Sequence, residues 1–283
     1  MTPARTAWTA HGPTASFVLL WSSGALFARG GLDSASPLAF LLLRFGVAFL
    51  VLVPLALAHG RLLPDKGTAP RTAATGALML GGYSLAYLLA LQAGLTPGVL
   101  ATTLGVQPLL TLLWVERDLP LRRLAGLLLS LAGLVLVVFD SLVVSRLPAA
   151  GIGWALAALS CVTAGSILQK RLAQPTLQVL PLQYAVSLAL CTLLLPWQPL
   201  QVEWDLRLLV CVAWLGLVIS VAATLLLYRL IQGGDLVNVT SLFYLVPGGT
   251  AVLDWVVFGT AMAPLAWAGM GLIVAGLWAV FRR

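Results

Sequence analysis

The residues in this chain that are best able to bind a ligand or carry out chemistry are charged side chains inside long apolar stretches. Arg44 and Asp254 both lie in such stretches, where a charged group costs roughly 2.5–3.5 kcal/mol on insertion scales. An ion pair between them would close one side of a helix bundle, and Arg44 alone would bind the carboxylate of a small molecule. Snorkelling or a structural interhelical bond explains both without function, and it is favoured for Asp254, near the end of its stretch.

Two prolines mark the second kind of candidate position. Pro108 and Pro247 fall near the middle of their stretches. Each lacks a backbone donor, so each should kink its helix and leave a carbonyl facing a cavity or a neighbour. Matched broken helices are typical of a transport site near the bilayer midplane.

Polar and aromatic residues gather around these kinks and on neighbouring stretches. Tyr83 and Tyr87 are one turn apart and share a helix face, and Trp21 lies mid-stretch, away from the interfacial belt. Such a set would line an aromatic-walled cavity for an apolar or cationic group, although packing and helix–helix bonding explain each residue taken alone. The expected substrate-binding set is Trp21, Ser22, Tyr83, Tyr87, Thr103, Gln107, Thr163, Asn238, Ser241 and Tyr244.

Other chemistry finds little support in the sequence. Cys161, Cys191 and Cys211 sit in apolar stretches and read as packing residues, and the two histidines are far apart, so we expect no metal and no cofactor. No Asp-x-x-Asp, His-Glu-x-x-His or phosphate-binding Gly-x-x-x-x-Gly-Lys-Ser/Thr motif occurs. We therefore expect no enzyme activity and no ATP-driven pump, and the scattered basic residues do not indicate nucleic acid.

The elements that position these residues follow from composition. Of 283 residues, 60% are hydrophobic and 9% are charged, against roughly 25% charged in soluble domains, so the sequence predicts an all-α integral membrane protein. A span needs about 20 apolar residues. Ten are expected, at 15–32, 38–58, 72–94, 97–115, 122–139, 149–169, 178–197, 206–228, 236–258 and 262–281.

The distribution of lysine and arginine predicts the orientation of the spans. With a cytoplasmic N-terminus, 12 of the 16 basic residues fall on the cytoplasmic side and 4 on the other. We therefore expect a multi-pass protein of the inner or plasma membrane with both termini in the cytoplasm.

The two halves of the sequence resemble each other. Leu43-Arg44-Phe45 matches Leu182-Gln183-Tyr184, and Pro108 matches Pro247, at an offset of 139. Gly126 and Gly133 match Gly269 and Gly276 at an offset of 143. Because each half holds an odd number of spans, the second must be inverted. Residues 1–143 and 144–283 are therefore predicted to be inverted five-helix repeats, an architecture of many secondary transporters.

The order of several short motifs resembles the drug/metabolite transporter superfamily, in particular proteins with two EamA repeats, over essentially the whole chain. The motifs are Trp21-Ser22-Ser23, Pro37 with Leu43-Arg44-Phe45, Leu91-Gln92, Gly105-Val106-Gln107-Pro108, Glu116, Tyr228-Arg229, Tyr244-Leu245-Val246-Pro247 and Phe258-Gly259, with the four glycines above. Gly259-Thr260 stands where the family usually has Gly-Glu.

This resemblance implies a ten-helix secondary carrier, commonly an exporter of amino acids or other small metabolites, with a site lined by spans 1, 3, 4, 6, 8 and 9. The expected partners are a small-molecule substrate and the lipid bilayer, with the chain a monomer or a homodimer. Proton coupling and facilitated diffusion stay open, as do two other classes, a channel and a membrane-embedded enzyme.

Overall fold

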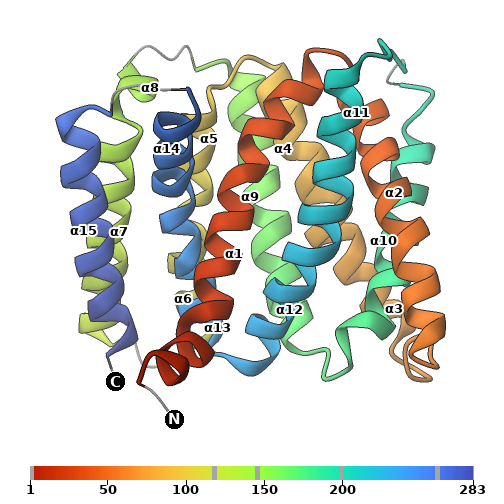
Figure 1. Cartoon of the computed structure of the whole chain (residues 1–283), viewed down its shortest axis with the longest axis horizontal. Coiled ribbons are helices and arrows are strands. Elements are labelled where there is room, and N and C mark those ends of the chain that lie inside the picture. The colour runs from red at the N-terminus through yellow and green to blue at the C-terminus, as the bar shows by residue number, and fades with distance from the viewer. Residues whose placement is uncertain (1–2, 117–119, 144–146, 198–199, 259–261, 283) are drawn as a thin grey trace.

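The computed structural model describes residues 3–116, 120–143, 147–197, 200–258 and 262–282, without the side chains of 3–11, 254, 257 and 258. These residues form helices and no named strand; an isolated bridge joins Ala35 to Val202. The fold is an all-helical bundle whose long helices run roughly side by side (Figure 1). The first residue of α1 and the last of α15 lie at the same end of the bundle, here called the termini end; the opposite end, which carries α8, is the α8 end (Figure 1).

The helices follow the expected spans in order. Their bounds are α1 (Pro3–Leu32), α2 (Pro37–Ala58), α3 (Ala69–Thr75), η1 (Gly76–Gly82), α4 (Tyr83–Gln92), α5 (Pro97–Leu104), α6 (Gln107–Val115), α7 (Leu121–Val137), α8 (Phe139–Val143), α9 (Ala149–Lys170), α10 (Thr176–Leu193), α11 (Leu206–Ala213), η2 (Trp214–Ala223), α12 (Thr224–Gly233), α13 (Leu236–Ser241), η3 (Leu242–Tyr244), α14 (Leu245–Phe258) and α15 (Pro264–Phe281).

Eight segments of the described chain are long and apolar enough to cross a membrane. They are Pro37–Ala58, Ala69–Gln92, Pro97–Val115, Ala149–Lys170, Thr176–Leu193, Leu206–Gly233, Leu236–Leu253 and Pro264–Phe281. Their lengths of 18–28 residues fit a hydrocarbon core of about 30 Å. The chain is therefore a multi-pass membrane protein. α1 and α7 run alongside these segments (Figure 1).

Four of these segments are irregular near their middles. Ala69–Gln92 contains the π-helix η1, and Leu206–Gly233 contains the π-helix η2. The other two are interrupted where the prolines were expected to act. α5 ends at Leu104, four residues before Pro108, and the 3₁₀ turn η3 contains Phe243, four residues before Pro247. A proline has no N–H for the carbonyl four residues earlier, so these breaks follow from the sequence.

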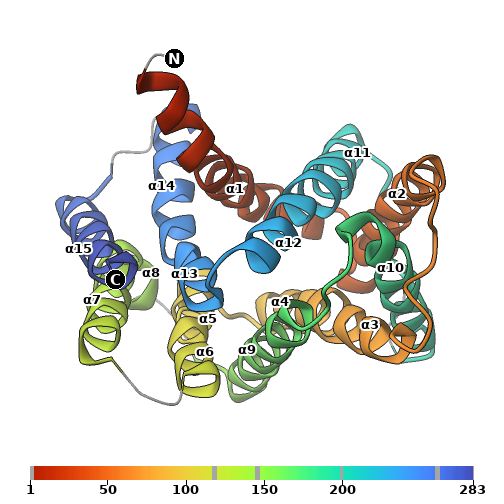
Figure 2. The ribbon, with the colours of Figure 1, turned by 90° about the horizontal axis from the view of Figure 1, so that it is seen from below.

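Close glycine contacts join α7 to α15. The two helices lie together at one side of the bundle in the view from the termini end (Figure 2). A Cβ placed on Gly126 would lie 2.7 Å from the carbonyl oxygen of Gly276, and one on Gly133 would lie 2.6 Å from that of Gly269. Ser130 Oγ donates to the carbonyl of Ile273 over 3.3 Å. The two backbones can approach this closely only because these positions lack side chains.

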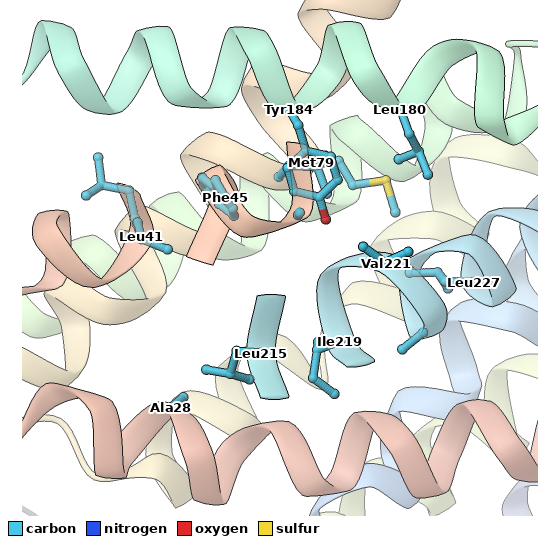
Figure 3. Close-up of a cluster of buried hydrophobic side chains, with 14 of the residues drawn as sticks. Ala28, Leu41, Phe45, Met79, Leu180, Tyr184, Leu215, Ile219, Val221 and Leu227 are labelled. Atoms are coloured by element: carbon cyan, nitrogen blue, oxygen red, sulfur yellow. The ribbon is translucent and has the colours of Figure 1, made fainter. Parts of the chain in front are cut away.

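The larger apolar core lies on the other side of the bundle. Figure 3 shows side chains from α1, α2, η1, α10, η2 and α12 converging there, among them Phe45, Tyr184, Leu215 and Ile219. The rings of Phe45 and Tyr184 meet edge to face, with centroids 5.6 Å apart. This packing fixes α2 against α10 and positions the neighbouring polar side chains.

Candidate functional site

A cavity of about 480 Å³ lies inside the bundle. It extends from Gln107, Tyr228 and Phe243 at mid-bundle to Asp140 and Ser141 on α8, and Asp140 is exposed. The cavity therefore reaches the surface at the α8 end. Its size lies in the usual range for small-molecule sites. Its walls come from the helices around it, including α2, α7 and α10 as well as the spans that the sequence implicated.

Arg44 is the one cation among the described residues that line the cavity. Its Nε donates to Ser220 Oγ over 2.8 Å, and its guanidinium carbon lies 5.7 Å from the centroid of the Phe45 ring. Within the described chain, the salt bridges include none to Arg44. The terminal amino groups of Arg44 are thus available to a ligand. The side chain of Asp254, the partner considered from the sequence, lies outside the described residues.

Aromatic residues form much of the wall around Arg44. Tyr83 and Tyr87 line the cavity with ring centroids 6.0 Å apart, and both are within electrostatic range of Arg44. Trp21 and Phe243 also line it and meet edge to face at 5.4 Å. These rings offer a flat apolar surface, and the tyrosine hydroxyls add hydrogen-bond donors.

The other predicted residues are divided between the cavity and its surroundings. Gln107 lines the cavity, and its Nε2 donates to Ser166 Oγ over 3.2 Å; Pro247 lines it as well. Pro108 is buried, but it is not among the residues that line the cavity. Ser22 lies behind the wall and donates to the carbonyls of Val18 and Val246 at 2.7 and 3.1 Å.

The remaining predicted polar residues also lie outside the cavity lining. Thr103 donates to the carbonyl of Val99 over 3.0 Å, and Ser241 to that of Asn238 over 2.8 Å. Thr163 and Tyr244 are buried, and their hydroxyls have no partner within the described chain. Tyr244 packs in the apolar cluster of α7 and α15 instead of facing the cavity.

An ionic cluster lies at the termini end, opposite the mouth of the cavity. Arg123 pairs with Glu116 and, over 3.1 Å, with Asp235, and its Nη2 donates to Asn238 Oδ1 over 2.9 Å. Asn238 is therefore part of this cluster. The Arg123 side chain is 19% exposed, so the cluster is partly shielded from solvent. It ties the end of α6 and the start of α7 to the start of α13.

A second polar contact strengthens the same end. Lys170, the last residue of α9, donates to the carbonyls of Gln232 at 3.0 Å and Gly234 at 2.6 Å. These carbonyls lie at the end of α12, where helices leave acceptors unpaired and cations are favourable. α9 is thereby held to α12 on the side away from the mouth.

The loops at the α8 end hold the two halves of the chain together. Ser36 N donates to the carbonyl of Gln201 at 2.9 Å, and Glu203 N to that of Ser34 at 2.7 Å. Asp205 caps α11: its carboxylate accepts from Leu208 N at 2.6 Å and from Ser34 Oγ at 3.0 Å. These bonds lower the pKa of Asp205, the Leu208 amide first and the Ser34 hydroxyl after it.

Sequence reasoning missed several residues of the wall. Phe243, Tyr184, Tyr228 and Thr250 line the cavity. Phe243 directly precedes the predicted Tyr244 and stands in the same motif. Tyr184 matches Phe45 in the repeat alignment, so the alignment offered a signal for Tyr184. Tyr228 stood in a family motif with no role assigned to it.

Together, the apolar helices and the internal cavity that reaches the surface define a polytopic membrane protein with a cavity of the size that small molecules occupy. The model of the EamA-like transporter family matches residues 14–139 and 149–282. The chain belongs to this family, and it is accordingly a membrane transporter of small molecules.

Solved structures agree with the fold. Of the 29 chains that match, one described as "Crystal structure of protein" is 24% identical and has a TM-score of 0.81, covering 96% of this chain and 97% of its own. No curated protein sequence matches.

Proposed function

We propose that this protein is a secondary carrier that exports small metabolites, such as amino acids, by alternating access across a cell's inner or plasma membrane. The observation that carries the proposal is the cavity itself. It reaches the surface at the α8 end, while the contacts of Arg123 and Lys170 tie helices together at the termini end. A carrier needs a central site open to one side and closed to the other.

Inverted repeats would give the chain a second, equivalent conformation. The contacts between α7 and α15 support this part of the proposal. The repeat alignment pairs Gly126 with Gly269 and Gly133 with Gly276, yet Gly126 packs on Gly276 and Gly133 packs on Gly269. Crossed contacts of this kind are expected across a two-fold axis.

Residues that match each other in the alignment also meet each other. Phe45 touches Tyr184, and Ser130 bonds Ile273, as expected of residues on such an axis. The π-helices η1 and η2 and the breaks before Pro108 and Pro247 also occur at matched positions. These matches support ten spans in two inverted sets of five, with α1 counted as the first span and α7 with α8 as the fifth.

The orientation follows from the bias in basic residues. The connection from α2 to α3, the start of α7 and the end of α9 lie at the termini end (Figure 1). These segments hold Arg61, Lys66, Arg122, Arg123 and Lys170, so we assign that end to the cytoplasm. The cavity then opens to the outside, the side to which an exporter releases its cargo. Proton-coupled export would require a titratable group in the spans, for which Asp254 is our candidate.

Counterflow tests the proposal. Proteoliposomes that contain the full chain are loaded with one of a panel of unlabelled amino acids or other metabolites, and uptake of the labelled compound is followed with and without a pH gradient. We expect saturable, trans-stimulated uptake for one chemical class. Uptake that does not saturate would indicate a channel, and consumption of the compound would indicate an enzyme.

A pair of variants ties any flux to the cavity. Ala101 lines the cavity, whereas Gly153 on α9 is exposed and has no atom within 4 Å of an added Cβ. We expect Ala101→Trp to fill the cavity and abolish counterflow, and Gly153→Trp to leave it unchanged. Equal flux through both variants would contradict transport through this cavity.

A further inference from the structure

The charges of the described lining residues are unevenly placed along the cavity, and their placement bears on what the cavity binds. Among the described lining residues, Arg44 is the single cation and Asp140 the single acid. Asp140 is exposed on α8, at the mouth. Arg44 lies seven residues beyond the first residue of α2, about 10 Å into the bundle. Among the described residues, the inner part of the cavity therefore carries one positive charge and no negative one.

The second repeat does not add another cation. Gln183 occupies the position that matches Arg44, and it is fully buried. Its Nε2 donates to Gln169 Oε1 over 3.0 Å, and its Oε1 accepts from Tyr228 over 2.7 Å. A neutral, bonded amide contributes no net charge to the cavity. The site is thus suited to one negative charge and not to a doubly charged phosphate.

The geometry around Arg44 fits a carboxylate. Ser220 occupies Nε and leaves the two terminal amino groups, a planar pair that matches the two oxygens of a carboxylate. The hydroxyls of Tyr83 and Tyr87 are further donors in the wall. The rings of Trp21 and Phe243, which meet edge to face, form a surface suited to an apolar body, preferably an aromatic one.

The described lining residues offer no full negative charge to an ammonium group at the depth of Arg44. Neutral acceptors are present, such as the carbonyl of Leu104, to which Pro108 cannot donate, whereas the carbonyl of Phe243 accepts a backbone N–H at the end of η3. A carbonyl is a neutral dipole, so it does not cancel the charge of a desolvated ammonium, whose transfer from water is costly without a partner.

We propose that the cavity selects monoanionic metabolites, a single carboxylate on an aromatic or branched apolar body, over zwitterionic amino acids. This proposal rests on the proposed carrier function for its physiological meaning. Within the small metabolites of that function, it favours carboxylates without an ammonium group over amino acids. Arg44 binds the carboxylate, Ser220 holds the guanidinium in place, and the Trp21–Phe243 surface contacts the apolar body.

Four ligands that share a phenyl ring on a short carbon chain, and differ in charge, test the proposal by equilibrium dialysis of the full chain in detergent. They are 3-phenylpropanoate (anion), phenylalanine (zwitterion), 3-phenylpropanamide (neutral) and 2-phenylethylamine (cation). We expect 3-phenylpropanoate to bind most tightly. Arg44→Gln should weaken its binding about 10- to 100-fold, the effect of losing hydrogen bonds to a charged group, and leave the binding of the amide unchanged.

Two further variants make the result specific. Arg44→Lys keeps the charge without the planar pair of donors, so we expect an intermediate loss and a test that does not depend on Arg44→Gln folding. Arg207→Gln is the matched control, because Arg207 lies outside the cavity lining and pairs with Asp33 at 2.6 Å. It should leave all four affinities unchanged.

Three results would overturn the proposal: binding of phenylalanine or 2-phenylethylamine at least as tight as that of 3-phenylpropanoate, an equal effect of Arg44→Gln on all four ligands, or no binding of 3-phenylpropanoate by folded protein. The carrier function is judged separately. Binding of the anion without counterflow contradicts the carrier, whereas counterflow of other compounds without anion binding contradicts only the substrate class.

Discussion

The glycine contact between α7 and α15 makes a sharp prediction about stability. A Cβ on Gly133 would lie 2.6 Å from the Gly269 carbonyl oxygen and 2.8 Å from the Ile273 backbone nitrogen. Both atoms belong to backbone, so neither can rotate away. Gly133→Ala therefore requires the two helices to separate by about 0.4 Å or more, and a close-packed interface does not absorb such a shift locally.

The expected cost of Gly133→Ala is about 1–3 kcal/mol, the usual range for overpacking. Gly271→Ala is the matched control, since Gly271 lies on α15, is exposed and has nothing within 4 Å of an added Cβ. Alanine there removes the conformational freedom of glycine, so we expect no loss and a gain of up to about 1 kcal/mol.

The two variants are compared by reversible unfolding in mixed micelles, followed by circular dichroism. The account requires Gly133→Ala to unfold at lower denaturant than the parent chain and Gly271→Ala at the same or higher denaturant. If both variants unfold together, the close contact between α7 and α15 would be refuted as a source of stability, along with its use as support for inverted repeats.

Two further predictions concern charges at or beyond the ends of the spans. Arg123→Gln should cost about 1–2 kcal/mol, because it breaks a partly buried ion cluster, whereas Arg61→Gln, whose side chain is 71% exposed in its ion pair, should cost under about 1 kcal/mol; equal losses in the same unfolding titration would contradict this ranking. The lowered pKa of Asp205 means that its carboxylate stabilises the fold above its unfolded pKa of about 4, and that this stabilisation is lost as the pH falls through the folded value. The free energy of unfolding of Asp205→Asn should therefore fall less steeply than that of the parent chain as the pH is lowered below about 4. An identical fall would be evidence against the capping role.

The sequence predicted the helical segments well because a long apolar run reports the bilayer directly. The spans expected at 97–115 and 236–258 coincide with α5 to α6 and with α13 to α14, and the breaks before Pro108 and Pro247 follow from the chemistry of proline. Hydropathy did not predict the π-helices η1 and η2, because their hydrogen-bond shift depends on packing against other segments.

The candidate site was harder to predict, because the direction in which a polar side chain points depends on contacts between distant segments. Trp21, Arg44 and Tyr83 line the cavity. Asn238 is instead bonded to Arg123, 115 residues away in the chain, and Tyr244 packs in the core. Composition identifies such residues as unusual in a membrane, but it does not distinguish a cavity wall from a buried interface.

The central claim, a site open to one side at a time, is tested most directly by the accessibility of the cavity to a membrane-impermeant thiol reagent. Ala101→Cys places the target in the cavity wall, and the parent chain, with Cys191 and Cys211 buried and Cys161 half-buried, gives the background. The account predicts labelling from the outer face in right-side-out vesicles and little from the inner face in inside-out vesicles. Adding Arg123→Gln should increase labelling from the inner face and decrease it from the outer face. Full labelling of Ala101→Cys from both faces of the membrane, in the presence or absence of Arg123→Gln, would contradict a site that is open to one side at a time.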